Sequence, residues 1–323
     1  MFKVFIASVL LLGFTQAVSG QESIPFYANW KKGDSFEYEI SKVNQSVWKT
    51  ASTSSHDSIS YKAKLTVIES TPLNYKLCWI VPANLSTLPL IESTLPAAAL
   101  KNIRTADLAD SIQIIYTTDK HGAIAEIVNW QEIIKKTPVL YQKALALLKN
   151  THGSAFEIER ENLKDFSNMI VSESDVYELF NDQISMVHMF YGSALKPDET
   201  VDLNEAELYH LLNDEPVKGH GAFYIDSLNK QTGFARLNYH LRADEEELML
   251  FFEEHIDQQI TDPDNLLKGK YDPAKATLSN DIVTEINTRA GIVINLTFTR
   301  SMFLIYKNDS FKAEKKISFK LLQ

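Results

Sequence analysis

The chain has 323 residues, a formal net charge of −10 and a hydrophobic fraction of 45%. That fraction is too high for a disordered chain, and an acidic total without a basic block argues against a nucleic-acid binder, which needs Lys and Arg to displace counterions from phosphate. The single cysteine, Cys78, excludes an internal disulfide framework and a Cys-rich zinc module.

Residues 1–20 have the parts of a secretory signal peptide. Lys3 supplies the positive charge, residues 4–14 are mostly apolar, and Val18 and Gly20 stand at the −3 and −1 positions of a small-residue cleavage region. The apolar run is shorter than the roughly 20 residues of a membrane span, and no cysteine near the cleavage region offers a lipid attachment point. We therefore expect an exported protein, periplasmic or extracellular, with no lipid anchor and no transmembrane span after cleavage.

Alternation of apolar and polar residues with a period of two dominates both ends of the mature chain. It occurs at residues 36–40, 61–67, 75–81, 235–241, 294–298 and 317–321. Alternation places successive side chains on opposite faces, and strands with one wet face are characteristic of antiparallel sheet. Cys78 lies inside one of these apolar runs, so we expect a buried, inert thiol instead of a catalytic one.

Helical signals cluster in the middle of the chain. Asn129 and Glu132 have capping-box spacing at the start of a short helix. Pro138 suits the first position of a second helix that runs to about residue 150. Ser172 or Ser174 caps a third helix, whose apolar stripe continues to about residue 191.

Shorter helices are predicted at residues 163–170 and 202–211, and the acidic run 244–247 suits the first turn of a helix that continues to about 261. Predicted loops cover residues 51–58, 82–110, 196–201 and 262–274. The segments 116–128 and 224–241 share a pattern of strand, Asp and Gly turn, and strand. Either a weak internal duplication or a recurring type of hairpin would explain this similarity between the two segments. The recurring hairpin is the simpler explanation, because Asp and Gly are common in turns.

No polar, Pro- and Gly-rich linker divides the mature chain, so residues 21–323 are predicted to form a single α+β domain. Its main element is a large antiparallel β-sheet. The alternation is compatible with a flat sheet and with one that is curved as a half-barrel. Helices from the middle of the chain, residues 129–191, are expected to pack on one side of this sheet.

The sequence contains no local motif for catalysis, metal binding or cofactor binding. Its eight His form no H-E-x-x-H pattern, and there is no Walker loop, G-x-G-x-x-G, calcium loop or G-x-S-x-G elbow. We therefore assign no catalytic residue, cofactor or metal. For a hydrolase site assembled from distant segments, the first candidates are His188, His240 and His255 with the acids around Glu247 and Glu254.

Two short segments carry recognisable turn motifs. The first is Trp30–Ile40, with the pattern W-x-x-G-D before a strand, and the second is Tyr116–Trp130, with Asp119 and Gly122. Both resemble segments of uncharacterised exported bacterial envelope proteins, which implies a Gram-negative envelope origin but brings no activity. At the level of architecture, long antiparallel strands with helices resemble the half-barrel of periplasmic lipoprotein carriers.

These observations favour a non-enzymatic envelope protein that binds an apolar or amphipathic ligand, or a protein partner, on its sheet. Two alternatives stay open, a secreted hydrolase with a non-local His and carboxylate site and a structural assembly component of the envelope. A concave apolar site without convergent titratable groups would favour binding. A cleft that gathers two of the candidate His and acids would favour the hydrolase.

Four N-x-S/T sequons, at Asn44, Asn84, Asn295 and Asn308, matter only in a eukaryotic secretory pathway.

The alternation from Tyr75 to Val81 predicts that Trp79 faces the core. Trp79→Asp would then place a carboxylate in apolar surroundings. Burial of an unpaired charge is strongly destabilising, so the protein should fail to fold. Thermal denaturation followed by circular dichroism measures this, and an unchanged melting temperature would show that Trp79 lies on the solvent face.

Overall fold

The computed structural model describes residues 22–49, 53–84, 107–152, 171–209, 216–251, 273–306 and 309–322. Most of the described strands belong to one 11-stranded sheet, and a second sheet pairs β1 (Ile24–Pro25) with β7 (Ala194–Leu195). The strands of the large sheet are β2 (Ser35–Trp48), β3 (Thr53–Ser70), β4 (Asn74–Asn84), β5 (Asp107–Asp119), β6 (Ile124–Ile127), β8 (Thr200–Tyr209), β9 (Pro216–Asn229), β10 (Phe234–Ala243), β11 (Pro273–Asn287), β12 (Ile292–Tyr306) and β13 (Asp309–Leu321).

The large sheet consists of two meanders joined side by side. Its strand order is β6-β5-β4-β3-β2-β13-β12-β11-β10-β9-β8, and every pairing is antiparallel. Each strand pairs with its neighbour in sequence, except that β13 pairs with β2. The sheet is not closed, because β6 and β8 form its two edges. The predicted large antiparallel sheet is therefore confirmed.

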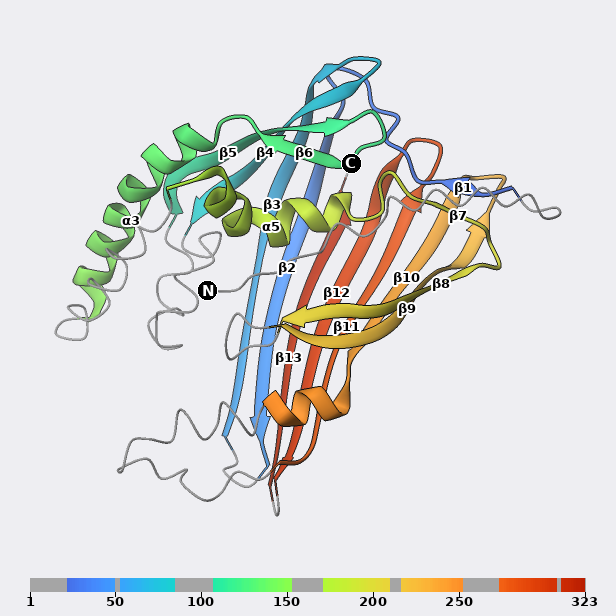
Figure 1. Ribbon diagram of the computed structural model, residues 1–323. Helices are drawn as coiled ribbons and strands as arrows, with labels where there is room; N and C mark the ends of the chain where they lie inside the picture. The colour runs from blue at the N-terminus through green and yellow to red at the C-terminus, as the bar shows by residue number, and fades with distance from the viewer. Residues whose placement is uncertain are drawn as a thin grey trace.

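The chain passes from one edge of the sheet to the other through two helices. These are α3 (Trp130–His152) and α5 (Glu173–His188), which lie between β6 and β8 in sequence. Figure 1 shows α5 and the β8–β9 hairpin on the same side of the central strands. Phe190, just after α5, stacks on Phe223 of β9 with ring centroids 4.9 Å apart. No described helix is both long enough and apolar enough to cross a membrane.

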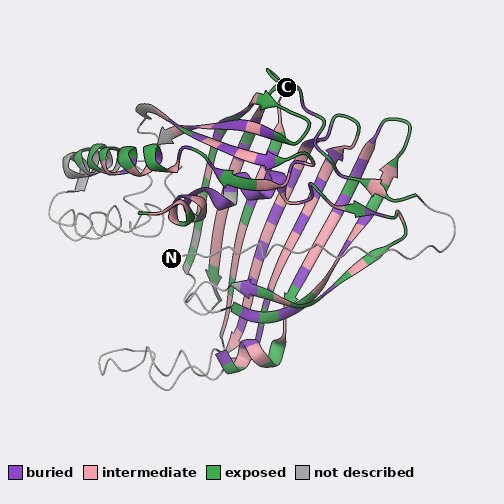
Figure 2. Ribbon diagram, turned by 45° about the horizontal axis from the view of Figure 1, so that its top comes forward, coloured by how far each residue is buried: buried purple, intermediate pink, exposed green. Residues whose placement is uncertain are grey.

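We call the face of the large sheet that carries Tyr38 and Ile40 the inner face. Register places Ala63 and Tyr61 of β3 beside these two residues, and all four are buried. Positions of opposite parity, such as Glu37 and Glu39, lie on the outer face, which is largely exposed or half-buried. Figure 2 shows the resulting alternation of buried and more exposed residues along the strands.

Two apolar clusters cover the inner face, one towards each end of the strands. The upper cluster includes Tyr38, Trp79 and Phe298, together with the buried α5 residues Val176 and Phe180. The lower cluster consists of Leu208, Val217, Leu241, Leu248, Phe251, Ala276, Leu278, Met302 and Leu304. The full burial of Trp79 confirms that it faces the core, and Cys78 is also buried, which raises the pKa of its thiol.

Two of the predicted helix starts are confirmed, and a side chain caps each of them. Ser172 and Asp175 form a reciprocal capping box at the start of α5. The Asp244 carboxylate accepts hydrogen bonds from the backbone of Glu246 and Glu247 and so caps the helical residues 245–251. At α3, however, the Asn129 side chain pairs with the backbone of β5 and does not cap the helix.

Several predicted boundaries are wrong. Residues 202–209 belong to strand β8 and not to a helix, because a β-bulge with Glu205 at φ 56° breaks the period of two that marks a strand. The predicted loop 51–58 overlaps β3, which begins at Thr53, and Pro138 lies inside the single helix α3. The predicted loop 196–201 overlaps the first two residues of β8, and the predicted loop 262–274 overlaps the first two residues of β11, while its residues 262–272 lie outside the described residues. The predicted helix 163–170, the residues 252–261 and most of the loop 82–110 lie outside the described residues.

The N-terminal segment is held against the turn between β11 and β12. The Trp30 Nε1–H and the Tyr191 hydroxyl both donate to the carbonyl of Gly291, at 2.7 and 2.8 Å. Gly291 has φ +60°, and a Cβ there would collide with backbone atoms of Tyr27 and Asn29. Gly291 is therefore required both for its backbone conformation and for the close approach of the segment.

Comparison of Gly291→Ala with Gly33→Ala separates the cost of a positive φ from the cost of the close approach of the N-terminal segment. Gly33 has φ +92°, but a Cβ there meets nothing within 4 Å. Gly33→Ala should therefore lower the free energy of unfolding by about 1 kcal/mol, the strain of a left-handed residue. Gly291→Ala should cost about 3 kcal/mol, because backbone must also move. Urea denaturation measures both, and equal losses would show that the N-terminal segment adapts without cost.

Candidate functional site

His188, in the last turn of α5, is the centre of a buried hydrogen-bonded network. Its Nδ1 lies 2.7 Å from the carbonyl oxygen of Gly122, and its Nε2 lies 2.7 Å from the hydroxyl of Tyr116. A carbonyl only accepts, so Nδ1 carries the hydrogen and Nε2 accepts from Tyr116. Burial lowers the pKa of His188 to about 4, so the ring is neutral at neutral pH.

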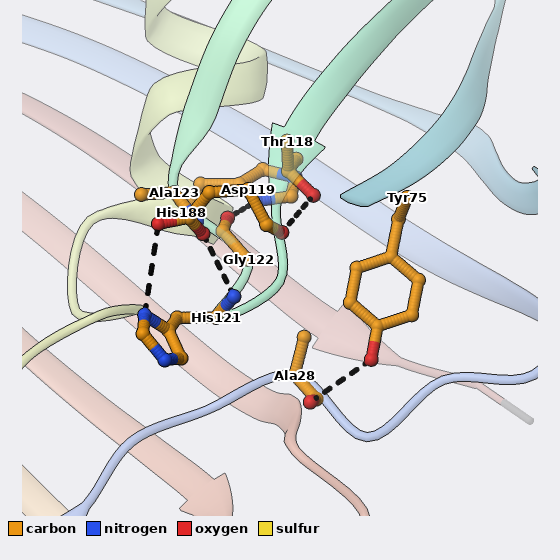
Figure 3. A network of polar contacts seen from close by, with 8 residues as sticks. All are labelled: Ala28, Tyr75, Thr118, Asp119, His121, Gly122, Ala123 and His188. Atoms are coloured by element: carbon orange, nitrogen blue, oxygen red, sulfur yellow. Dashed lines mark hydrogen bonds and ion pairs between the residues drawn. The ribbon is translucent and has the colours of Figure 1, made fainter. Parts of the chain in front are cut away.

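The turn at residues 119–123 presents its carbonyl to His188 (Figure 3). The Asp119 carboxylate accepts hydrogen bonds from the backbone N–H groups of His121 and Ala123, at 2.8 and 2.9 Å. Gly122 has φ +101°, and a Cβ would lie 2.9 Å from the side chains of Ala28 and Tyr191. The Asp and Gly motif noticed in the sequence is therefore a turn that positions one backbone carbonyl.

This network positions secondary structure and leaves neither ring nitrogen of His188 free. Both ring nitrogens of His188 have protein partners, and Trp30 and Tyr191 pack against the ring with centroids 5.7 and 5.6 Å away. A general base needs a nitrogen within reach of a substrate proton. His188 has none available in this arrangement.

The other described candidates for a hydrolase site, His240 and Glu247, are not gathered around His188. His240 lies on the outer face of β10, where its Nδ1 contacts the carboxylate of Asp281 on β11. Glu247 accepts a hydrogen bond from the backbone N–H of Lys218 at 2.9 Å. His255 and Glu254 lie outside the described residues. The described part of the chain holds no group of three or more His, Cys, Asp or Glu that could bind a metal ion.

A polar band crosses the inner face between the two apolar clusters. Asn44 of β2, Lys315 of β13, Arg300 of β12 and Asn280 of β11 are successive cross-strand partners, and Asp57 of β3 extends the row beyond Asn44. We call these five residues, together with Lys42 on the next inner position of β2, the polar band. Cross-strand partners have Cβ atoms about 5 Å apart, so the band is a continuous strip of side chains.

Arg300 is anchored within the band. It is buried to 5% exposure, its Nε–H donates to the Asn280 side-chain oxygen at 2.8 Å, and its guanidinium carbon lies 5.7 Å from the ring centroid of Phe298. Lys315 is directly opposite Arg300, and like charges in that arrangement destabilise a sheet. Apolar residues of similar size would stabilise the fold better than these cations. The band is therefore a candidate for function and not only for stability.

Sequence reasoning missed the polar band, although a signal is present. On β2, β12 and β13 the apolar inner positions Ile40, Phe298 and Ile317 each have a cation two residues away on the same strand, after Ile40 and Phe298 and before Ile317. These cations are Lys42, Arg300 and Lys315. Each looks like the solvated end of a strand when it is taken alone, and only the register shows that they lie together.

Two hollows are lined by described residues. A cavity of about 40 Å³ lies between α3 and β5, beside Ile133, Thr137 and Phe180, and has room for water but not for a larger ligand. An open hollow lies at the β9–β10 turn, beside Asp226 and Lys230. Neither hollow is lined by residues of the polar band.

No protein-family model and no curated protein sequence matches this chain.

The lowered pKa of His188 predicts a loss of stability in acid. The unfolded chain takes up this proton near pH 6.5 and the folded protein only near pH 4. The stabilisation is therefore fully present above about pH 6.5 and is lost as the pH falls towards 4, by roughly 2 to 3 kcal/mol. Urea denaturation at pH 7 and pH 4 measures the difference.

His188→Gln should remove this part of the pH dependence. His220→Gln, at an exposed position of β9, is the matched control and should keep it. If His188→Gln and the unchanged protein lose the same free energy between pH 7 and pH 4, His188 is not the group that titrates.

Proposed function

We propose that this protein is a non-enzymatic envelope protein that binds an amphipathic ligand on the inner face of its sheet. The observation that carries the proposal is the polar band between two apolar clusters, with Lys42 and Arg300 buried and Lys315 half-buried. An amphipathic molecule has both kinds of surface and can satisfy both at once, with apolar groups against the half-buried Ile59 or Ala313 and polar groups against the band.

In this proposal the helices from the middle of the chain pack on one side of the sheet and cover the upper part of the inner face. The apolar stripe of α5 supports this, because Val176, Phe180 and Ile184 belong to the same buried cluster as Tyr38. The sheet then acts as a curved support, as in the half-barrel of periplasmic lipoprotein carriers that the sequence resembles in architecture. The resemblance supports the architecture alone, since one fold hosts many functions.

The proposed location follows from the N-terminus. A signal peptide at residues 1–20 would send the mature chain to the periplasm or the outside of the cell without a lipid anchor. A carrier or binding protein in that compartment has a physical role, because amphipathic molecules cross an aqueous space poorly unless their apolar surface is covered.

The geometry gives less support to the alternative of a hydrolase. His188 is on the inner side with both nitrogens engaged, and His240 is on the outer face beside Asp281. Two candidates on opposite faces of one sheet do not form a site, so binding is the function that the described residues favour.

Native mass spectrometry of protein purified from its own host tests the proposal. We expect an additional mass of a small molecule that is lost under denaturing conditions. Protein that is consistently empty would contradict the proposal. A blocking variant gives the position of the ligand, because Ala313→Trp adds bulk on the inner face beside the polar band, where Ala313 pairs with Met302.

Lys312→Trp adds the same bulk one residue away on the outer face and is the matched control. The additional mass should disappear in Ala313→Trp and persist in Lys312→Trp, with circular dichroism showing that both variants fold. Loss from both variants, or from neither, would place the ligand elsewhere than on the inner face.

A further inference from the structure

Lys42 is a buried lysine in the middle of the inner face. It is only 5% exposed, and its cross-strand partners are two isoleucines, Ile59 of β3 and Ile317 of β13. Within the described part of the chain, Lys42 makes no hydrogen bond and no ion pair. Its stem is surrounded by apolar core, while its ammonium group has three donors to satisfy.

An ammonium group in this position is costly unless something provides a negative partner. Removing a charged group from water without a partner costs several kcal/mol in real proteins. The surrounding residues increase the demand, since Lys315 lies diagonally across the β2–β13 pair and Arg300 lies one strand further. Asp57 lies diagonally across the β2–β3 pair, so the band holds three cations and one carboxylate, and its net positive charge favours an anion.

Lys42 differs from Arg300, the second buried cation, because the charged group of Arg300 is held by a side chain of the protein. The Arg300 guanidinium is positioned by Asn280 and packs against Phe298. A lysine ammonium group on the same face as a positioned guanidinium, with one strand between them, is suited to accept an anionic group from outside the chain.

We infer, on the basis of the proposed function, that Lys42 binds the anionic headgroup of an amphiphile with an alkyl chain, such as a carboxylate or a phosphate. The headgroup lies at the polar band, where Lys42 donates to its oxygens. The alkyl chain lies against half-buried apolar residues beside the band, either Ile59 at the edge of the upper cluster or Ala313 and Phe311 at the edge of the lower one. The protein thus selects negatively charged amphiphiles over neutral ones of the same chain length.

Calorimetric titration of delipidated full-length mature protein tests this inference with three probes of equal chain length. The probes are dodecanoate, dodecyl phosphate and the neutral dodecanol. We expect at least one anionic probe to bind ten times more tightly than dodecanol, and the preferred anion distinguishes a carboxylate ligand from a phosphate ligand. Equal affinity for all three probes would overturn the inference and leave the proposed function standing. Failure of all three probes to bind would count against the proposed function itself.

Substitutions at Lys42 locate the effect. Lys42→Met keeps the length of the side chain and removes the charge, so it should weaken binding of the anionic probe at least tenfold and leave dodecanol unchanged. Lys42→Arg keeps the charge and should retain the preference. Lys316→Met, at an exposed outer position of β13, is the matched control and should bind all probes as the unchanged protein does.

The stability of the ligand-free variants provides a second readout. If Lys42 has no anionic partner in the ligand-free protein, Lys42→Met removes an unpaired buried charge. The substitution should then raise the melting temperature of delipidated protein. A lowered melting temperature together with unchanged binding of the anionic probe would show that a carboxylate of the chain itself pairs with Lys42, and the inference would be wrong.

Discussion

The pairing of β2 with β13 is the constraint on which the rest of the structure depends. Strands β2–β6 and β8–β13 are two meanders, in which each strand pairs with its neighbour in sequence, and the β2–β13 pairing joins them into one hydrogen-bonded sheet. Its partners lie near opposite ends of the chain, so loop closure makes it entropically expensive and slow to form. The apolar pair Ile40 and Phe319, buried on the inner face, offsets that cost. The sheet is therefore stable only when both meanders are complete.

The polar band lies across this junction. Lys42 and Asn44 belong to the first meander, while Lys315 and Arg300 belong to the second. Neither meander alone assembles the cations, so the candidate site exists only in the fully folded protein. Three cations at the central junction of a sheet weaken the contact that the fold most needs, which is a cost that selection for stability alone would remove.

The sequence predicts the local features of this fold and misses those that depend on register. Alternation identifies most strands, and the Ser172 capping box marks the start of α5, because both patterns lie within a few neighbouring residues. The bulge at Glu205 hides β8, since one inserted residue turns a period of two into an apparently helical spacing. Lys42 and Arg300 are far apart in the chain, and nothing local indicates that strand pairing brings them together.

Two kinds of buried polar group therefore have to be distinguished on this inner face. His188 has a protein partner for each ring nitrogen, and a satisfied polar group of this kind fixes one geometry, here the position of α5 over the turn at Gly122. Lys42 is equally buried, but the described residues give its ammonium group no partner. A satisfied group is fully explained by the fold, whereas an unsatisfied charge requires a partner that the described fold does not supply. Binding of an anion is the explanation that accounts for both the burial of Lys42 and its position between two apolar surfaces.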